Sequence, residues 1–291
     1  MRIKTLILCF TLIFLSGCHY VTSIPQEEPS LSPAPTPSQS TSVAPTPTTT
    51  QSPSPFLMKR TIALYYTGQT QEGLKLFREF RSIPSTSDTA LYALRFLVSK
   101  YQKPLDPDYQ NLWGNGSTIH SISYSGNHAT VDLAVSPLNI GSEAEQRAID
   151  QLVWTLTANH PTTKYVHFTS NGKPFQSFAG FVDATQTFSR QLHYEVLAAV
   201  WVDQTRAVMS NPVTITGSAC TFEAGVHWVL IRNGDIVKED HTMAAGACPV
   251  RGGWSVRLGN LRAGNYVFIA QDISAKNGEV VQEDSKEFTI K

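Results

Sequence analysis

The chain has 291 residues, a formal net charge of zero and 17 prolines. This length accommodates about two domains, and the balanced charge gives no general affinity for nucleic acid or acidic lipid. Many of the prolines lie between Pro25 and Pro55, close to one end of the chain. The sequence therefore predicts a tail followed by folded domains, and it predicts that any partner is recognised by local shape.

The first residues have the order of a secretory signal. A basic start is followed by a short apolar run from Leu6 to Leu15 and then by small residues. The run is too short to cross a hydrocarbon core about 30 Å thick, which needs about 20 residues. Basic, apolar and small segments in this order are typical of a signal peptide. We therefore interpret residues 1–17 as a signal peptide.

The string LSGC, residues 15–18, resembles the bacterial lipobox. The resemblance implies that Cys18 carries a diacylglycerol thioether and palmitate-type acyl chains, and becomes the N-terminus after cleavage. Each buried CH₂ contributes about 0.8 kcal/mol, so two or three acyl chains hold a protein where one does not. An ordinary signal with a chance cysteine and a short uncleaved anchor are the alternatives. We expect a lipoprotein on the extracytoplasmic face of the cell membrane.

Residues 18–60 form a segment of low complexity. Between Ser23 and Pro55 almost every residue is Ser, Thr, Pro, Gln or Ala. Such a segment cannot bury enough apolar surface to offset its ordering entropy. We predict a disordered, partly polyproline linker that reaches at most on the order of 120 Å, at about 3.1 Å per residue. A spacer is the favoured interpretation, and docking through PxxP-like strings is the alternative.

Residues 61–190 have the pattern of a first folded domain. We expect its elements in this order: a strand over 61–66, an extended piece ending at Pro84, a helix over 85–101 capped by Ser87 or a neighbour, a hairpin around Gly126-Asn127, a helix over 141–161 and a strand over 165–169. In the second helix Ser142 and Glu145 have the spacing of a capping box. Together these elements predict an α+β sandwich, with two helices on one face of a small sheet.

Four landmarks of this domain resemble a known family. They are an Ala-Leu-rich helix after Ile83-Pro84, the strand ATVDLA (129–134), the helix QLVWTLT (151–157) and a strand ending in VHFTSNGKP (166–174). In this order they resemble the GerMN domain, found in sporulation and germination proteins and in other bacterial envelope lipoproteins. The resemblance implies a structural or scaffolding role in envelope assemblies, without enzymatic activity.

Residues 193–291 show short strands separated by turns and no helical period. The pair Asn233-Gly234 is the strongest hairpin signal, and Asn277-Gly278 marks another. This pattern predicts a β-sandwich. The order VTITGSA, TFEA, a Gly-Gly-Trp before a strand and a final Asn-Gly hairpin resembles the immunoglobulin-like domain that often follows GerMN in spore-germination and envelope proteins.

Cys220 and Cys248 both lie in this second domain. Outside the cytoplasm, two cysteines in one β-domain usually form a disulfide, and this one would join loops, since Cys220 follows a strand and Cys248 lies in a Gly-rich loop. A metal site with His227 and His241 is the alternative, but the spacing matches no known zinc pattern.

The sequence contains no catalytic motif of the G-x-S-x-G, HExxH, P-loop or G-x-G-x-x-G kinds. The acidic pair Asp106 and Asp108 is interpreted as shaping a loop. Glu143 and Glu145 lie where a helix N-terminus favours negative charge. We therefore expect no enzymatic activity, no metal and no cofactor.

Tryptophans are the remaining candidates for ligand binding. Trp113 and Trp254 have the positions of residues that stack on glycan rings, although core packing is the favoured interpretation for both. Trp154 lies beside the main helix stripe, so it either flanks the core or joins an interface. Trp201 and Trp228 are interpreted as sandwich core.

Two functional hypotheses follow. The first is a non-enzymatic scaffold or binding protein, attached to the membrane through Cys18, that contacts a second copy of itself, another envelope protein or peptidoglycan. The second is a peptidoglycan-acting enzyme or a cofactor of a wall hydrolase. A role in sporulation or germination is a narrower form of the first hypothesis.

Overall fold

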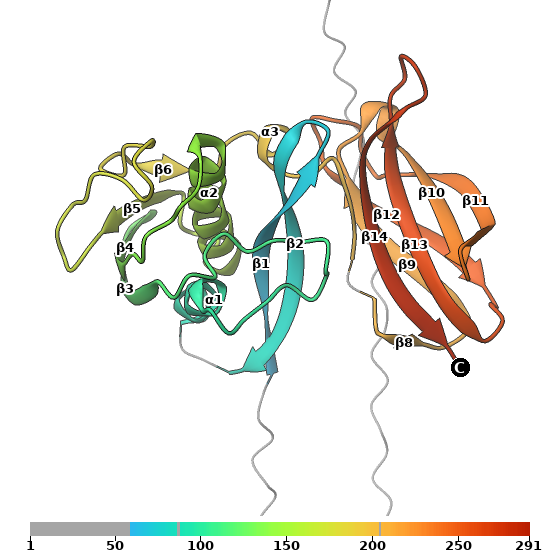
Figure 1. The fold of residues 1–291 in the computed structure, drawn as a ribbon, viewed down its shortest axis with the longest axis horizontal. Helices are drawn as coiled ribbons and strands as arrows, with labels where there is room; N and C mark the ends of the chain where they lie inside the picture. Colours follow the sequence, from blue (N-terminus) through green and yellow to red (C-terminus); the bar gives the residue numbers. More distant parts are fainter. Residues whose placement is uncertain (1–58, 86–87, 204) are drawn as a thin grey trace, which may run out of the picture. The chain divides into compact units, whose positions relative to one another are not determined.

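Strands account for most of the regular structure in the computed structural model, which describes residues 59–85, 88–203 and 205–291 (Figure 1). These residues belong to one compact unit. The signal peptide, Cys18 and the linker expected from the sequence lie outside the described residues. Among the residues described, no helix is long and apolar enough to cross a bilayer.

The first domain begins with a long antiparallel hairpin of β1 (Lys59–Thr70) and β2 (Gly73–Pro84). Consecutive residues 62–66 are all buried, so β1 is covered on both faces. A strand that is covered on both faces has a continuous apolar run instead of an alternating pattern. This explains the sequence TIALYY at its centre.

Two helices, α1 (Thr89–Val98) and α2 (Ser142–Asn159), pack against each other and against this hairpin (Figure 1). Beyond them lies a sheet in the order β3-β4-β5-β6, made of β3 (Thr118–Ser125), β4 (His128–Ala134), β5 (Tyr165–Thr169) and β6 (Phe188–Ser189). Strands β4 and β5 are parallel, and α2 is the crossover that a parallel pair requires. The helices therefore have strands on two sides.

The cap of the first helix is the neighbour of Ser87 that the sequence allowed, whereas the cap of the second helix differs from the predicted one. Helix α1 is capped by Asp88, whose Oδ1 accepts a hydrogen bond of 2.8 Å from the backbone N–H of Leu91. The predicted capping box of α2 is wrong, because the helix already includes Ser142 and its N-cap is Gly141, without a side-chain cap bond. Glu145 instead turns away from the helix start and binds a loop.

That loop, residues 177–182, is held by the Glu145 carboxylate. Glu145 is fully buried. Five donors within 2.6–3.0 Å reach its two oxygens: the hydroxyl of Ser177 and the backbone N–H groups of Phe178, Ala179, Phe181 and Val182. Burial acts to raise the pKa of Glu145, but these hydrogen bonds outweigh it, so the pKa lies below its usual value.

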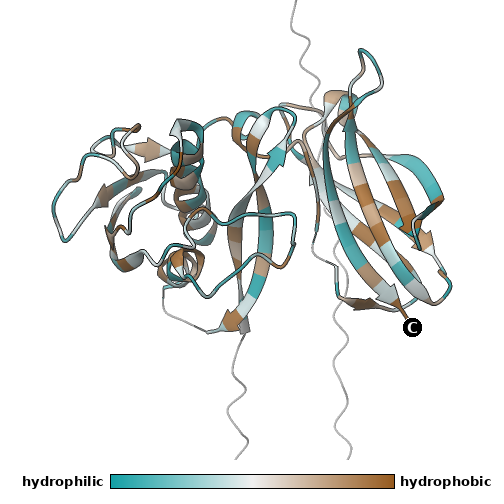
Figure 2. Ribbon diagram, viewed as in Figure 1, coloured by the Kyte–Doolittle hydropathy of each residue, from teal (hydrophilic) through white to brown (hydrophobic). Residues whose placement is uncertain are grey.

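The second domain follows the short helix α3 (His193–Val196) and is a sandwich of two sheets. One sheet has the order β11-β10-β13-β14-β8 and the other β12-β9-β7. The strands are β7 (Val200–Val202), β8 (Val208–Met209), β9 (Val213–Ala219), β10 (Gly225–Arg232), β11 (Asp235–Met243), β12 (Gly252–Gly259), β13 (Gly264–Ile273) and β14 (Val280–Ile290). Figure 2 shows hydrophobic and hydrophilic residues alternating along these strands, as a half-buried sheet requires.

Each domain has its own hydrophobic core, and the tryptophans divide between them. Trp113 and Trp154 lie in the first core, and Trp228 and Trp254 lie in the second. Trp201 was predicted in the sandwich core, but its side chain packs in the first core although β7 belongs to the sandwich. Neighbouring Val200 and Val202 point the other way, into the second core, because side chains alternate along a strand.

Candidate functional site

A buried cluster of charged side chains joins the two domains, and we call its four residues, Asp106, Tyr109, Asp284 and Lys286, the joint. The Lys286 ammonium lies on β14 and donates to Asp106 Oδ2 at 2.6 Å, to Asp284 Oδ1 at 2.8 Å and to the Tyr109 hydroxyl at 2.9 Å. The Tyr109 hydroxyl in turn donates to Asp284 Oδ1 at 2.8 Å. Two residues of each domain thus share one network.

The charges of the joint depend on one another because water is excluded from them. Lys286 is 9 % exposed, Asp106 7 % and Asp284 4 %. Burial acts to lower the pKa of Lys286, but the two carboxylates outweigh it and the pKa is raised. Burial raises the pKa of Asp284, and Lys286 opposes this effect. The ammonium of Lys286 therefore forms ion pairs with two carboxylates, and its removal would leave Asp106 and Asp284 without this cation.

Hydrogen bonds to backbone N–H groups position both acidic residues of the joint. Glu79 on β2 is buried beside Arg81 and accepts hydrogen bonds of 2.9 Å from the backbone N–H groups of Leu105 and Asp106. On the other side, Asp284 Oδ2 accepts a 2.6 Å bond from the backbone N–H of Val202. The loop that carries Asp106 and the strand that carries Asp284 are therefore each positioned by additional hydrogen bonds, independently of Lys286.

Further contacts between the domains surround the joint. They are Gln282 Nε2 donating to Glu72 at 2.7 Å, Gln71 Nε2 to the carbonyl of Val280 at 2.7 Å, Ser285 Oγ to Asp108 at 3.0 Å, and the ion pair of Arg78 with Asp203 at 3.6 Å. The backbone also takes part, since the N–H of Ala198 donates to the carbonyl of Leu76 at 3.0 Å. These contacts extend the polar interface between the two domains beyond the joint.

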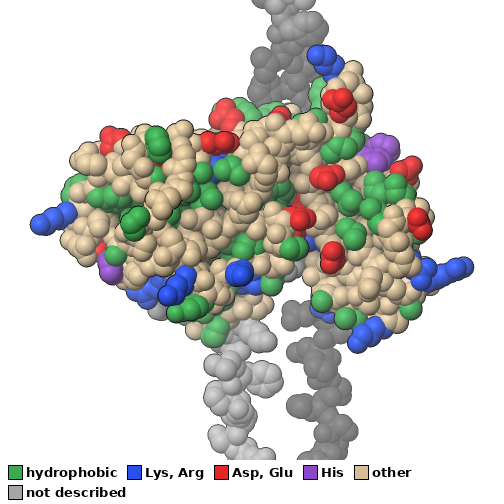
Figure 3. Space-filling model, viewed as in Figure 1, with side chains coloured by type: hydrophobic (Ala, Val, Ile, Leu, Met, Phe, Trp, Pro, Cys, Tyr) green, Lys and Arg blue, Asp and Glu red, His purple; other side chains and the backbone are tan. Residues whose placement is uncertain are grey.

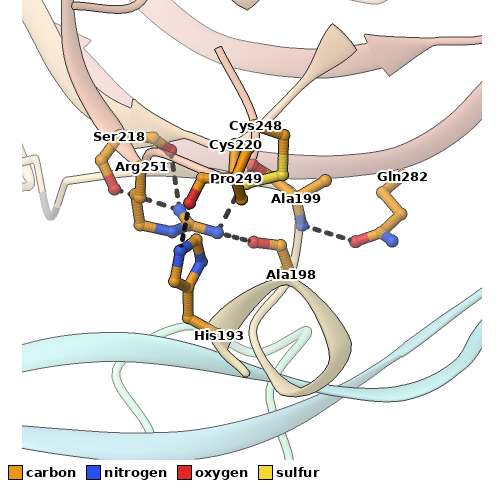
Figure 4. The surroundings of a disulfide bond; sticks show 9 residues. All are labelled: His193, Ala198, Ala199, Ser218, Cys220, Cys248, Pro249, Arg251 and Gln282. Carbon is orange, nitrogen blue, oxygen red and sulfur yellow. Dashed lines mark hydrogen bonds between the residues drawn. A yellow bond between two sulfur atoms is a disulfide. The ribbon is translucent and has the colours of Figure 1, made fainter. Parts of the chain in front are cut away.

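The segment that connects the domains is also held by a half-buried arginine, Arg251. The guanidinium of Arg251 lies 3.9 Å from the ring centroid of Trp201. It donates to the backbone carbonyl of Ala198 and to both oxygens of Ser218 (Figure 4). Burial lowers the pKa of Arg251 to about 10. Figure 4 also shows His193, whose Nε2 lies 2.6 Å from the carbonyl of Pro249. Arg251 and His193 thus attach the segment between the two domains, residues 193–199, to the loop between β11 and β12.

That loop carries the predicted disulfide. Cys220 and Cys248 are bonded, with their Cα atoms 4.5 Å apart (Figure 4). Cys220 follows β9 directly and Cys248 lies between β11 and β12, so the bond joins loops as expected. In this bonded state the two sulfurs are not thiolates, which is the form of cysteine that ligates a metal together with residues such as His227 and His241. Within the described residues, no group of three His, Cys, Asp or Glu side chains is arranged to hold a metal.

The two tryptophans considered for glycan stacking are core residues. Trp113 is fully buried, and its Nε1 donates to the carbonyl of Ala148 at 2.7 Å. Trp254 is 4 % exposed and stacks on Phe268 in the sandwich. Neither presents a ring face to a ligand, so the core-packing interpretation holds for both. Lipidation of Cys18 falls outside the described residues.

The joint is not among the sites expected from the sequence, although strand β14 contains a signal for it. Along β14 the buried positions alternate, and they include Gln282, Asp284 and Lys286 as well as Phe288 and Ile290. Phe288 and Ile290 are apolar and two positions apart, as on the buried face of a strand. Continuing this alternation toward the start of β14 places the polar residues Gln282, Asp284 and Lys286 on the same buried face. Buried polar groups require partners, so this strand predicts a polar contact. Its partner, 180 residues away in the chain, is not predictable from spacing.

The surface has no patch of one charge in the face that Figure 3 shows. Lys and Arg side chains and Asp and Glu side chains are dispersed there among neutral and hydrophobic ones. This agrees with the formal net charge of zero.

Comparisons with known proteins identify both domains. A family model described as sporulation and spore germination matches residues 63–176, and a model described as the immunoglobulin-like domain of bacterial spore germination matches residues 199–279. No curated protein matches the chain.

Solved structures are also similar to parts of the chain. The first GerMN domain of the sporulation protein GerM from Bacillus subtilis is 20 % identical over 46 % of this chain and 98 % of its own, with a TM-score of 0.35. The tandem GerMN domains of the same protein are 18 % identical over 70 % and 62 %, with a TM-score of 0.37. A proposed lipoprotein from Clostridium perfringens is 16 % identical over 46 % and 90 %, with a TM-score of 0.31. The chain carries a sporulation and spore germination (GerMN) domain followed by the immunoglobulin-like domain of bacterial spore germination.

Proposed function

We propose that the protein is a lipid-anchored, non-enzymatic scaffold of the bacterial envelope, acting outside the cytoplasm in sporulation, germination or envelope assembly. The observation that carries this proposal is the joint, in which Lys286 binds Asp106 and Asp284 across the domain boundary. Both domains have family descriptions that refer to spore germination and name no reaction.

A scaffold needs binding surfaces at a constant separation. Domains within one chain usually move relative to each other unless their interface is extensive. Here the boundary contains a buried ion network, a backbone hydrogen bond and the insertion of Trp201 into the first core. A network of this kind adds specificity to an interface more than it adds stability. The joint therefore fits a protein that presents two surfaces in one fixed arrangement.

The remaining parts of the proposal come from the sequence. Cys18 would hold the protein to the membrane by its acyl chains, and the linker would set the distance between the membrane and the domains. The partner would be another envelope protein, peptidoglycan or a second copy of the chain. No nucleic acid is proposed as a partner, because the net charge is zero.

The proposal can be tested with purified residues 54–291, the compact unit that contains both cores. The fragment should bind sacculi or a solubilised envelope protein in a saturable way, without releasing wall fragments. In cells, a Cys18→Ala variant should leave the membrane fraction. A wall-degrading activity that single substitutions abolish would contradict the proposal and favour the enzyme.

A further inference from the structure

A cavity of about 410 Å³ opens on the first domain beside the start of β5 and the end of β6, and we call it the β5–β6 cavity. Its lining includes two cationic residues, Lys164 and Arg190, together with the hydroxyl groups of Thr157, Tyr165 and Ser189. No acidic residue lines it. A cavity of this size accommodates a small ligand, and cations with hydroxyl groups are the usual partners of an anion.

Arg190 is held in place by a hydroxyl group and an aromatic ring. Its Nε donates to Thr157 Oγ1 at 2.7 Å, and its guanidinium lies 4.3 Å from the ring centroid of Trp154. Among the described residues, no ion pair includes Arg190 or Lys164. The two terminal nitrogens of the guanidinium are therefore available, in a geometry that matches two oxygens of a phosphate or carboxylate. Partial burial of the guanidinium lowers the pKa of Arg190.

Tyr165, another residue that lines the cavity, has an exposed ring that is stacked on a neighbouring ring. Tyr165 is 40 % exposed and stacks on His128, with 4.8 Å between ring centroids. His128 stacks on His167 at 5.3 Å, and their Nδ1 and Nε2 atoms lie 3.1 Å apart. The Nδ1 of His167 lies 3.3 Å from the hydroxyl of Thr187. This row of rings holds Tyr165 as a flat surface with a polar tip, which suits a sugar ring.

We propose that the β5–β6 cavity binds a saccharide that carries an oxyanion, either a phosphate or a carboxylate. Arg190 binds two oxygens of the anion, Lys164 adds a second positive charge, and Tyr165 packs against the sugar. The flat ring beside the charges favours a glycan over a bare anion. The inference goes beyond the scaffold role, because the cavity is separate from the joint and from the lipid anchor.

The binding can be measured by ¹⁵N NMR titration of residues 54–291 with four probes: glucose 6-phosphate, glucuronate, inorganic phosphate and neutral glucose. The amides of Lys164, Tyr165 and Ser189 and the Nε–H of Arg190 should shift with at least one anionic sugar. That sugar should bind more tightly than inorganic phosphate, and neutral glucose should produce no shift. Comparison of glucose 6-phosphate with glucuronate identifies whether phosphate or carboxylate is preferred.

Variants make the test specific. Arg190→Gln should weaken binding of the anionic sugar by at least about tenfold, the value of one charge-assisted contact. Lys164→Gln, at an exposed position, should weaken it by about threefold with the fold intact. The control Arg257→Gln, an exposed arginine on β12, should leave it unchanged. The proposal is overturned if neither anionic sugar shifts these signals, if phosphate alone binds as tightly, or if Lys164→Gln has no effect.

Discussion

The joint and the β5–β6 cavity place similar charges in opposite situations. At the joint, the ammonium of Lys286 has two carboxylates and a tyrosine hydroxyl within 2.9 Å. At the cavity, the guanidinium of Arg190 has one hydroxyl and one aromatic ring, and no carboxylate pairs with it in the part of the chain that is described. The charge of Lys286 is therefore used to join the domains, whereas the charge of Arg190 is available for a ligand.

The largest effect is expected from Lys286→Met. The substitution leaves Asp106 and Asp284 buried without a cation, and the loss of one partner from a buried pair costs about 3–5 kcal/mol. Urea unfolding of residues 54–291 should therefore show a lower midpoint. The control Lys276→Met, at an exposed turn, should leave the midpoint unchanged. Equal midpoints for Lys286→Met and the unsubstituted protein would show that the joint does not hold the domains.

Removal of the disulfide should have a slightly smaller effect. Cys220 and Cys248 are separated by 28 positions, and closing a loop of this size stabilises a protein by about 3–4 kcal/mol in the chain-entropy model. The double variant Cys220→Ser, Cys248→Ser should unfold at a lower temperature, and reduction of the unsubstituted protein should reproduce the shift. If the variant and the reduced protein melt like the oxidised one, the loop is held by Arg251 and its other contacts alone.

Glu145 is a third kind of charged residue, a buried anion whose partners are four backbone N–H groups and one hydroxyl group. Glu145→Gln should cost about 2–3 kcal/mol, because charge-assisted hydrogen bonds are lost and an amide N–H₂ faces N–H donors. Amide hydrogen exchange over residues 178–182 should accelerate, while exchange in the sandwich should not. Unchanged exchange in this loop would mean that other contacts hold it.

The same carboxylate predicts a dependence on pH. The pKa of Glu145 is lowered from its usual value of 4.5, so the folded protein binds this proton less readily than the unfolded chain does. Its stabilising contribution is present above about pH 4.5 and is lost as the pH falls through the folded-state pKa. Thermal melts between pH 3 and 6 should show a steeper loss for the unsubstituted protein than for Glu145→Gln. Parallel curves would contradict this assignment.

The smallest effect on stability is expected from Arg190→Gln. The substitution removes a cation–π contact of about 0.5–1 kcal/mol, but it also relieves the partial desolvation of the guanidinium. We expect a change in the free energy of unfolding below about 1 kcal/mol, measured by urea unfolding beside Lys286→Met. A loss as large as that of Lys286→Met would break the comparison and make Arg190 a structural residue.

Local patterns in the sequence predicted much of the fold. Helical spacing indicated α1 and α2, and Asn233-Gly234 indicated the turn of the β10–β11 hairpin. The disulfide followed from two cysteines in a domain outside the cytoplasm. The error at Trp201 has a physical cause. Strand β7 is covered on both faces, so all of its residues are apolar. Its sequence therefore does not indicate which side chains point into the first core and which into the second.

Contacts between segments that are distant in the chain could not be predicted from these local patterns. Glu145 has the spacing of a capping residue, yet a loop more than 30 positions away offers its carboxylate more donors than the helix start does. The cavity likewise brings Lys164 and Arg190 together through the pairing of β5 with β6. The sequence places neither residue in a motif, so only the fold makes them neighbours.

The central claim is that the joint makes the two domains one body. ¹⁵N relaxation of residues 54–291 measures this directly, since it reports the rotational correlation time of each domain separately. We expect one common correlation time for both domains and two different, shorter ones in Lys286→Met. Two different correlation times in the unsubstituted protein would contradict the claim, because the domains would then move independently.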